Sequence, residues 1–301
     1  MLDDLSRGSE RVGLKINMDK KKIMSNIHVT HSHEDRRLYT RKLKRSIVES
    51  DFAGQRSREA TQYVFVPTTA VSQDESLWPV RVTYIHKQEL QSLSKFEQYF
   101  LKFPFVSAFL QDADVNVIVL DWSTLANRSY TTAKGGTAAV GRGLGQFVNW
   151  LNQLGLSYDL VHLVGFSLGG HLVGNAGRET ESLVRRITAL DPAGPLWGRD
   201  NNRVVPSDGR YVEVMHTNTG FLGYTDPDPC GDADFYPNGG SNMPGCLINK
   251  CSHCRSYELM ASSVKYNHLL ANECASLRDA TRDDCTGTPN PMGNSDIFKS
   301  R

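Results

Sequence analysis

One segment, VHLVGFSLGGH at residues 161–171, predicts more of the structure than any other part of the chain. Its first residues are apolar, as in a buried strand of a parallel sheet, and Gly165, Ser167 and Gly169 follow in the spacing G-x-S-x-G. This spacing is typical of a sharp strand-to-helix turn, where the serine backbone is strained and glycine lets the neighbouring chain pass close by. The peptide N–H of Leu168, at the start of the helix, then points to where an oxyanion would form. The segment therefore predicts a nucleophilic serine, and the alternative is a turn with only a structural role.

The rest of the chain has the pattern of an α/β protein. From about residue 60 onward, short apolar runs alternate with amphipathic ones, which predicts strands alternating with helices. The expected strands are Val115–Leu120, Leu160–Val164, Ile187–Leu190 and Tyr211–Met215, and a helix is expected from about Thr132 to Leu154. We therefore expect a central, mostly parallel sheet flanked by helices, with its chemistry at the carboxyl ends of the strands.

A serine hydroxyl is a weak nucleophile at neutral pH, so it needs a histidine base and a carboxylate that orients the base. Asp191 directly follows one predicted strand and precedes Pro192, which places it on the same edge of the sheet as Ser167. By itself, such an aspartate could equally begin an ordinary turn. The candidate bases are His86, His162, His171, His216 and His253. Only His253 completes the order Ser, Asp, His of α/β-hydrolases in a loop, whereas positions in a strand or helix favour a packed role for His162 and His171.

All six cysteines lie between residues 230 and 285, and three of them fall in CLINKCSHCR, residues 246–255. An even number of clustered cysteines suits disulfides and an oxidising compartment. Cys246 and Cys251 bracket four residues, which suits a small disulfide loop that fixes the direction of His253. The alternative is a zinc site of Cys246, Cys251, His253 and Cys254, but Cys-x-His-Cys crowds three ligands into four residues. We therefore expect no metal and no other cofactor.

The first 60 residues differ from the rest in charge. Residues 1–50 carry 12 Lys and Arg against 7 Asp and Glu, although the whole chain of 301 residues has a formal net charge of +1. Such a charge run usually marks a solvated, disordered segment, and nucleic-acid binding is the alternative. Residues 7–26 also resemble a fragment of a retroelement reverse transcriptase. We interpret residues 1–60 as a disordered segment or a fusion artefact and residues 61–301 as the α/β-hydrolase domain. We do not expect the protein to bind nucleic acid.

No targeting or membrane segment is recognisable. No apolar run reaches the roughly 18 residues that span a bilayer, and MLDDLSRGSE lacks the apolar stretch of a secretory signal. The cysteines nevertheless indicate a fold that evolved for secretion.

Together, the motifs resemble the pancreatic lipase family, secreted α/β-hydrolases that include triacylglycerol lipases, phospholipases A1 and insect neutral lipases. The matching segments lie within roughly residues 110–260, and more weakly to 301, in the order of the family: VIVLDWS, HLVGFSLGGH, ITALDPAGP, VEVMHTN, DFYPNGG, MPGC and CSHCRSYE. The resemblance implies Ser167 as nucleophile, Asp191 as its orienting acid and His253 as base. It also implies the disulfides Cys246–Cys251, which closes the lid, and Cys274–Cys285, with Cys230–Cys254 left to pair. Because the chain stops shortly after Cys285, neither a C-terminal β-sandwich domain nor a colipase partner is implied.

Two features depart from the family pattern. Members usually carry His-Gly-aromatic after an early strand, where a backbone N–H completes the oxyanion hole; here the counterpart is residues 85–88, IHKQ, with Lys87 in place of glycine and Gln88 as the candidate donor. Losing one such donor costs about 100- to 1,000-fold in rate, so weak activity is an alternative. The counterparts of a structural calcium loop are Asp200, Arg203 and Asp208, but Val205 stands where a further carboxylate is expected. We predict no calcium.

The short lid bears on the substrate. Triacylglycerol lipases of the family have a lid of some twenty residues that forms an amphipathic flap, whereas LINK is too short for two helical turns. We therefore expect an open site and a phospholipase A1-like enzyme that cleaves the sn-1 ester of phosphoglycerides at a lipid interface. The alternatives are a triacylglycerol or neutral lipase, and, in a different class, a silent yolk-type relative that binds lipid.

Overall fold

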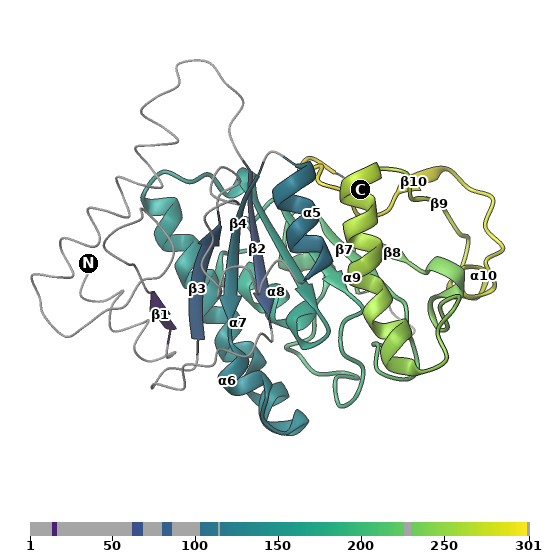
Figure 1. The fold of residues 1–301 in the computed structure, drawn as a ribbon, viewed down its shortest axis with the longest axis horizontal. Helices are drawn as coiled ribbons and strands as arrows, with labels where there is room; N and C mark the ends of the chain where they lie inside the picture. Colours follow the sequence, from purple (N-terminus) through teal and green to yellow (C-terminus); the bar gives the residue numbers. More distant parts are fainter. Residues whose placement is uncertain are drawn as a thin grey trace, which may run out of the picture.

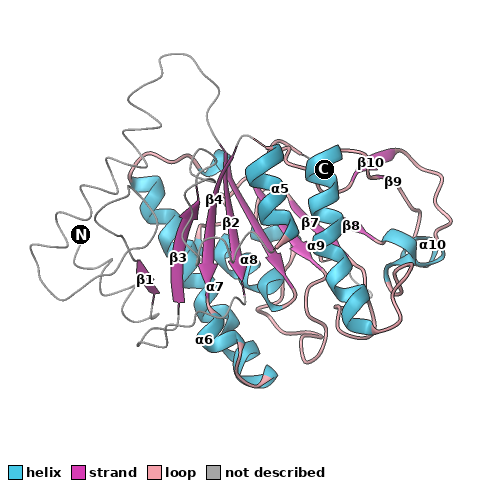
Figure 2. Cartoon of the chain, viewed as in Figure 1, coloured by secondary structure: helices cyan, strands magenta, loops and turns pink. Residues whose placement is uncertain are grey.

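The computed structural model describes residues 14–16, 62–68, 80–85, 103–113, 115–225 and 230–299. In this part of the chain, eight strands form one sheet with the order β1-β3-β4-β2-β5-β6-β7-β8 (Figures 1 and 2). Their bounds are β1 Leu14–Ile16, β2 Gln62–Thr68, β3 Val80–Ile85, β4 Val115–Asp121, β5 Val161–Phe166, β6 Arg186–Leu190, β7 Val212–Met215 and β8 Ala233–Phe235. All neighbouring pairs are parallel except β3 and β4. The predicted fold class and the four predicted strands are thus confirmed.

Helices cover both faces of the sheet. The long helix α7, Tyr130–Gln153, and α8, Leu168–Glu179, pack on one face, and α5, Pro104–Asp112, and α9, Asn249–Tyr266, pack on the other (Figure 1). Side chains of β4 alternate between the two layers: Ile118 and Leu120 face the α7–α8 core, whereas Val117 and Val119 face the α5–α9 core. A strand with two buried faces has no solvated side, which explains why VNVIVL is apolar at every position except Asn116, which is also buried.

Smaller elements lie beyond and between these layers. They are α6 Ser123–Ala126, the 3-10 turns η3 Tyr158–Leu160, η4 Pro206–Asp208 and η5 Pro237–Gly240, α10 Leu277–Arg282, and the antiparallel pair β9 Leu270–Asn272 and β10 Pro289–Pro291. Helix α7 begins two residues before the predicted start, because the Ser129 side chain caps it by accepting the Thr132 N–H at 3.3 Å. Within the described ranges, no helix combines the length and the apolar character that crossing a membrane requires.

The end of the described chain is tied to the sheet by buried charges. Arg186 of β6 and Glu213 of β7 are both fully buried and form an ion pair at 3.1 Å, and Lys299 forms a second ion pair with Glu213. Arg186 also donates to the backbone oxygen atoms of Gly293 at 2.7 Å and Asp296 at 2.7 Å. Residues 293–299 are therefore held against β6 and β7 by these contacts. The buried charges of Arg186, Glu213 and Lys299 would be costly without their partners.

Of the predicted basic segment 1–60, only Leu14–Ile16 belongs to the described residues. These three residues pair in parallel with β3 at the edge of the sheet. The expected disorder of the remainder lies outside the described residues.

Candidate active site

Ser167 occupies the sharp turn between β5 and α8. Its φ is 56° and its ψ is −121°, a strained conformation for a residue other than glycine. The turn is fixed by two backbone hydrogen bonds: the Ser167 N–H donates to the Leu190 oxygen at 3.0 Å, and the Ala193 N–H donates to the Ser167 oxygen at 3.1 Å. A Cβ atom at Gly165 would lie 2.0 Å from the Gly169 oxygen, so only glycine fits there. The structure thus has the turn that G-x-S-x-G predicts, and it holds the half-buried Ser167 next to the end of β6.

Asp191 follows β6 directly and is fully buried. Its φ of 41° turns the chain out of the strand, and its N–H donates to the Met215 oxygen of β7 at 2.7 Å. One carboxylate oxygen, Oδ1, accepts the backbone N–H groups of Thr217 at 2.8 Å and Asn218 at 3.1 Å. The other, Oδ2, lies 2.5 Å from Nδ1 of His253. Because every one of these partners can donate, the surroundings of Asp191 suit an ionised carboxylate, which can only accept.

His253 was expected in a loop, but it lies in the second turn of α9 and reaches the strand edge from the opposite helix layer, because the helix already begins at Asn249, inside the short lid. Its ring is buried and packs against Phe166, the residue before Ser167, with ring centroids 4.6 Å apart. Since Nδ1 faces Asp191, Nε2 is the ring nitrogen that remains for a proton transfer. The backbone oxygen of His253 accepts a hydrogen bond from the Ser256 hydroxyl at 2.9 Å, within the same helix. Three elements, β5–α8, β6 and α9, therefore bring the three predicted catalytic residues to one edge of the sheet.

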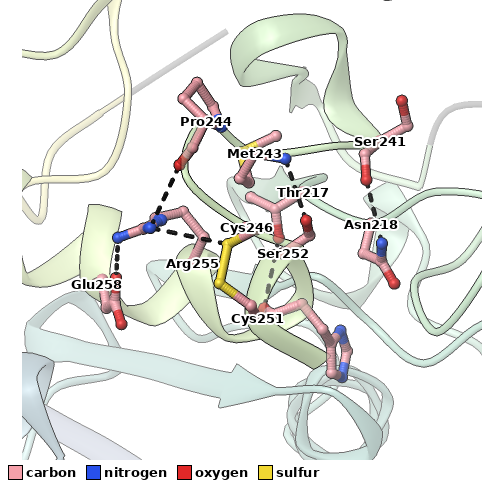
Figure 3. The surroundings of a disulfide bond; sticks show 11 residues. Thr217, Asn218, Ser241, Met243, Pro244, Cys246, Cys251, Ser252, Arg255 and Glu258 are labelled. Carbon is pink, nitrogen blue, oxygen red and sulfur yellow. Dashed lines mark hydrogen bonds and ion pairs between the residues drawn. A yellow bond between two sulfur atoms is a disulfide. The ribbon is translucent and has the colours of Figure 1, made fainter. Parts of the chain in front are cut away.

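The disulfide Cys246–Cys251 anchors the start of α9 (Figure 3). Its S–S distance is 2.03 Å, and Cys251 is two residues before His253. The Met243 N–H donates to the Ser252 hydroxyl at 3.1 Å, which ties the preceding loop to the same turn of helix. Because both sulfur atoms are bonded to each other, the structure does not provide the thiolates that the alternative zinc site would need.

Two of the other candidate histidines, His162 and His171, are packed, as their positions in a strand and a helix suggest. His162 of β5 bonds to the Thr188 hydroxyl at 2.8 Å, and burial lowers its pKa well below the usual value, with the charges of Arg186 and Lys299 acting in the same direction. His171 of α8 bonds to the Ala193 oxygen at 2.8 Å through Nε2. Burial lowers the pKa of His171 to about 3, so it is neutral at physiological pH.

His216 follows β7 and belongs to a polar cluster that the sequence did not indicate. Its Nε2 lies 2.8 Å from Oδ1 of Asp234, and its ring stacks on Tyr236 with centroids 4.5 Å apart. Asp234 also accepts the backbone N–H groups of Cys230 at 3.1 Å and Gly231 at 3.0 Å. The ligand atoms of His216, Cys230 and Asp234 lie within 4.8 Å of one another. The Asp234 carboxylate already has three hydrogen-bond partners, so we interpret the cluster as one that holds β8 in place. His86 lies outside the described residues.

The predicted disulfide Cys230–Cys254 is absent from the structure, in which both residues are thiols. Cys230 lies beside Asp234 at the start of β8, whereas Cys254 lies on α9 beside the Tyr257 side chain. Cys230 and Cys254 thus contact residues of different elements, β8 and α9. Their spacing in the sequence does not show this. The structure joins the other two predicted pairs, Cys246–Cys251 and Cys274–Cys285, with the latter S–S distance 2.08 Å.

The oxyanion donors remain a prediction. Leu168 is the first residue of α8, where backbone N–H groups lack partners within the helix. Gln88, the second candidate, lies outside the described residues. Strand β3, which precedes it, runs antiparallel to β4, and its last residue, Ile85, pairs with Val117 near the start of β4.

The two carboxylates among the counterparts of the calcium loop, Asp208 and Asp200, have cationic partners in the structure. Asp208 accepts two hydrogen bonds from the Arg178 guanidinium, at 2.8 and 3.0 Å, and burial raises the pKa of its carboxyl against the effect of that charge. Asp200 pairs with Lys134. Arg203, the third counterpart, donates to the Asp200 backbone oxygen at 3.4 Å.

Three loops around the catalytic edge expose large apolar side chains. Leu247 and Ile248, within the short lid, are 98% and 65% exposed. Leu196, Phe221 and Leu222, in the loops after β6 and β7, are also exposed. Backbone hydrogen bonds join these loops: the Gly194 N–H donates to the Leu222 oxygen at 2.7 Å, and the Thr219 N–H donates to the Gly240 oxygen at 2.9 Å. We call these five exposed residues the apolar rim.

The mostly parallel sheet, with the strained serine turn and the carboxylate and histidine at one edge, has the arrangement of the α/β-hydrolase fold. The chain belongs to the lipase family, whose model, described as Lipase, matches residues 13–297. It is 37% identical over 201 residues to Lipase member H of Oryctolagus cuniculus, which covers 62% of this chain and 44% of that protein. It is 37% identical over 202 residues to Pancreatic lipase-related protein 2 of Rattus norvegicus, covering 58% of this chain and 43% of that protein. It is 38% identical over 194 residues to Lipoprotein lipase of Homo sapiens, covering 56% and 41% respectively.

The chain thus spans less than half the length of these curated relatives. Among solved structures, it is similar to an α/β hydrolase enzyme from a Medee basin deep-sea metagenome library, with a TM-score of 0.30 and 13% identity, over 54% of this chain and 59% of that one.

Proposed function

We propose that the chain is a carboxylic ester hydrolase that acts on lipids through an acyl-enzyme formed on Ser167. The observation that carries the proposal is the 2.5 Å contact between Asp191 and the His253 ring, which packs against the neighbour of Ser167. Membership of the lipase family supports the same reaction class.

In the proposed reaction, the Ser167 hydroxyl attacks the ester carbonyl while Nε2 of His253 takes its proton. Asp191 holds the ring in the tautomer with Nδ1 protonated and stabilises the imidazolium that forms. His253 then gives the proton to the leaving alcohol, and the acyl group stays on Ser167. In the second half, His253 takes a proton from water, and the water oxygen attacks the acyl carbonyl. His253 then returns that proton to the Ser167 oxygen as the bond to the acyl group breaks and the fatty acid is released.

For the substrate, we propose phosphoglycerides cleaved at the sn-1 ester. The support is the lid: Cys246 and Cys251 enclose only four residues, and the last two of them already belong to α9. Such a loop cannot fold over the site as an amphipathic flap, so a polar head group has room. The second candidate is a triacylglycerol lipase, and the apolar rim favours it, because exposed apolar side chains suit an oil surface as well as a membrane. Either substrate would be met at a lipid interface, and we propose no colipase and no nucleic acid as partners.

We also propose an oxidising, extracellular location. The support is the pair of disulfides, Cys246–Cys251 and Cys274–Cys285, which are rare in reducing compartments.

The test compares the wild-type protein with Ser167→Ala, and with Ser262→Ala in the C-terminal half of α9 as a matched control. We expect Ser167→Ala to lower hydrolysis by at least about a thousandfold and to prevent labelling by a fluorophosphonate, while Ser262→Ala behaves as wild type. Substrate class is measured on phosphatidylcholine vesicles and on tributyrin across its solubility limit. Release of lysophospholipid from vesicles supports the phospholipase; a sharp rate increase on tributyrin droplets without lysophospholipid supports the triacylglycerol lipase. Equal labelling of wild type and Ser167→Ala would refute the mechanism, and a wild type that fails to react at all would favour a silent lipid-binding relative.

A further inference from the structure

A buried tryptophan links the loop after β6 to the helix that follows Ser167. Trp197, in that loop, is buried, and its ring stacks on the ring of His171 in α8 with centroids 3.8 Å apart and an interplanar angle of 20°. The Nζ atom of Lys134, in the second turn of α7, lies 4.5 Å from the centroid of the Trp197 ring. A lysine ammonium so close to an indole ring makes a favourable cation–π contact. Three elements that are distant in the sequence thus meet at Trp197.

Hydrogen bonds extend this contact to the serine turn. Nδ1 of His171 accepts the Val204 N–H at 3.1 Å, so Nε2 is the nitrogen that carries the proton, and it donates to the Ala193 oxygen at 2.8 Å. The Ala193 N–H in turn donates to the Ser167 oxygen at 3.1 Å. The position of the His171 ring therefore bears on the backbone that holds Ser167 in its strained conformation.

Lys134 also forms an ion pair with Asp200, in the same loop as Trp197. The Asp200 N–H donates to the Trp197 oxygen at 2.7 Å, so the carboxylate and the indole ring belong to one tight turn. The side chains of Lys134 and Asp200 are 18% and 22% exposed, so solvent screens their attraction in part, and the contact with Trp197 adds to it. One turn earlier in α7, the Tyr130 hydroxyl donates to the Pro195 oxygen at 2.6 Å. The start of α7 therefore holds the loop at three points.

This loop contains the counterparts of the structural calcium loop, and its residues do not fit a calcium ion. Calcium takes about six to eight oxygen ligands. The carboxylate and backbone oxygen atoms that this loop could offer accept N–H groups of the chain instead, and they belong to Asp200, Asn201, Arg203 and Asp208. Arg178 donates to three of these four residues, and Lys134 pairs with the fourth. A divalent cation would lie beside two positive side chains, and Val205 offers no carboxylate that could offset them.

We propose that Lys134 is a positioning residue of the candidate active site, and that its ammonium is the cation that holds the loop of Trp197 and Asp200 against α8. Lys134 acts through the Trp197 ring on His171, and His171 acts through the Ala193 backbone on the serine turn. The effect on ester hydrolysis rests on the proposed function, whereas the hold on the loop does not. An activity assay and a measurement of the loop itself therefore test the two separately.

The experiment compares the full-length wild type with two variants of the lysine. Lys134→Met keeps an unbranched side chain without the charge, whereas Lys134→Arg keeps the charge and can stack on an indole ring. In Lys134→Met we expect kcat on a soluble nitrophenyl ester and the rate of fluorophosphonate labelling to fall about tenfold with KM little changed, because a displacement of about 1 Å can cost about 100-fold. Lys134→Arg should stay within about threefold of the wild type. Lys265→Met is the matched control, because Lys265 also lies near an aromatic ring, 5.2 Å from the Tyr266 centroid, but in the last turn of α9.

Trypsin cleavage after the exposed Arg199 measures the hold on the loop without any need for esterase activity. We expect severalfold faster cleavage in Lys134→Met, because local opening of the loop exposes the bond, and the wild-type rate in Lys265→Met. Asp200→Asn removes the same ion pair from the other side, so it should also be cleaved faster, and it takes the place of Lys134→Met if that variant does not fold. The wild type should show the same cleavage rate and melting temperature in EGTA and in calcium chloride.

The proposal is overturned if Lys134→Met folds and matches Lys265→Met in kcat, labelling and cleavage, or if calcium stabilises the wild type. Equal losses in Lys134→Arg and Lys134→Met would show that the charge is not what matters, and faster cleavage with an unchanged kcat would leave Lys134 a structural residue only; either result also overturns it. Faster cleavage of Lys134→Met in a protein without esterase activity would support the hold of Lys134 on the loop and refute only the proposed function.

Discussion

Replacing Gly223 with alanine should displace the carboxylate that orients the catalytic base. A Cβ atom at Gly223 would lie 2.5 Å from Oδ1 and 2.8 Å from Oδ2 of Asp191, whereas ordinary contact begins at 3.4 Å. The carboxylate must therefore retreat by roughly 1 Å from a residue whose Oδ2 now lies 2.5 Å from His253. A misplacement of about 1 Å can cost about 100-fold in rate, which corresponds to about 2.7 kcal/mol of transition-state stabilisation.

The assay is kcat/KM on a short-chain nitrophenyl ester, with the rate of fluorophosphonate labelling as a second measurement. The loss should fall on kcat and on the labelling rate, with KM little changed, because Gly223 touches the carboxylate and not the substrate. Gly198→Ala is the control: a Cβ there meets nothing within 4 Å, and Gly198 lies in the neighbouring loop. If Gly223→Ala folds and keeps activity within threefold of Gly198→Ala, the carboxylate is not held as tightly as the structure indicates.

Two further predictions concern stability. The pKa of His171 is lowered by burial to about 3 in the folded protein against about 6.5 when unfolded, so the unfolded state binds the proton first as the pH falls. Urea denaturation should show stability decreasing from pH 6.5 toward pH 3, with a contribution from this residue of about 4 to 5 kcal/mol at most, and His171→Gln should flatten that dependence; an unchanged dependence would contradict the assignment. Glu213→Gln removes the partner of Arg186 and Lys299, and we expect a loss of about 3–5 kcal/mol in thermal or chemical unfolding. Glu258→Gln, at an exposed ion pair, should cost less than about 1 kcal/mol, and equal losses in the two variants would argue against the buried network.

The parts of the site that could be predicted from the sequence share one physical property. Ser167 and Asp191 both follow apolar strands directly, and parallel strands place their carboxyl ends on the same edge. The pattern therefore fixed their neighbourhood without any knowledge of strand order. The order Ser, Asp, His along the chain selected His253 among the five candidates, and the packed positions of His162 and His171 agree with that choice, although His253 itself lies in α9.

The parts that could not be predicted depend on contacts between loops. The two amide donors to Asp191 come from residues 217 and 218, and Gly223 closes over the same carboxylate. No local pattern marks backbone N–H groups as ligands of a side chain 26 residues away. The antiparallel direction of β3 beside β4 also depends on contacts between segments that are distant in the sequence, and the apolar pattern of a single strand does not encode its direction. For Cys230, elimination of the other cysteines suggested Cys254 as its partner, but the structure does not join the two.

The two helix layers have unequal roles at the site. Ser167 and Asp191 directly follow neighbouring strands of one sheet, and the Ser167 N–H donates to the Leu190 oxygen, so the same sheet edge positions both. His253 belongs to α9, which approaches from the opposite face and meets this edge through the Asp191 contact and the Phe166 ring. The position of the base relative to the nucleophile is therefore set by how α9 packs on the α5–α9 core and by the disulfide at its first turn. It follows that a covalent change at the start of α9 can alter His253 while the strained serine turn and its carboxylate stay as they are.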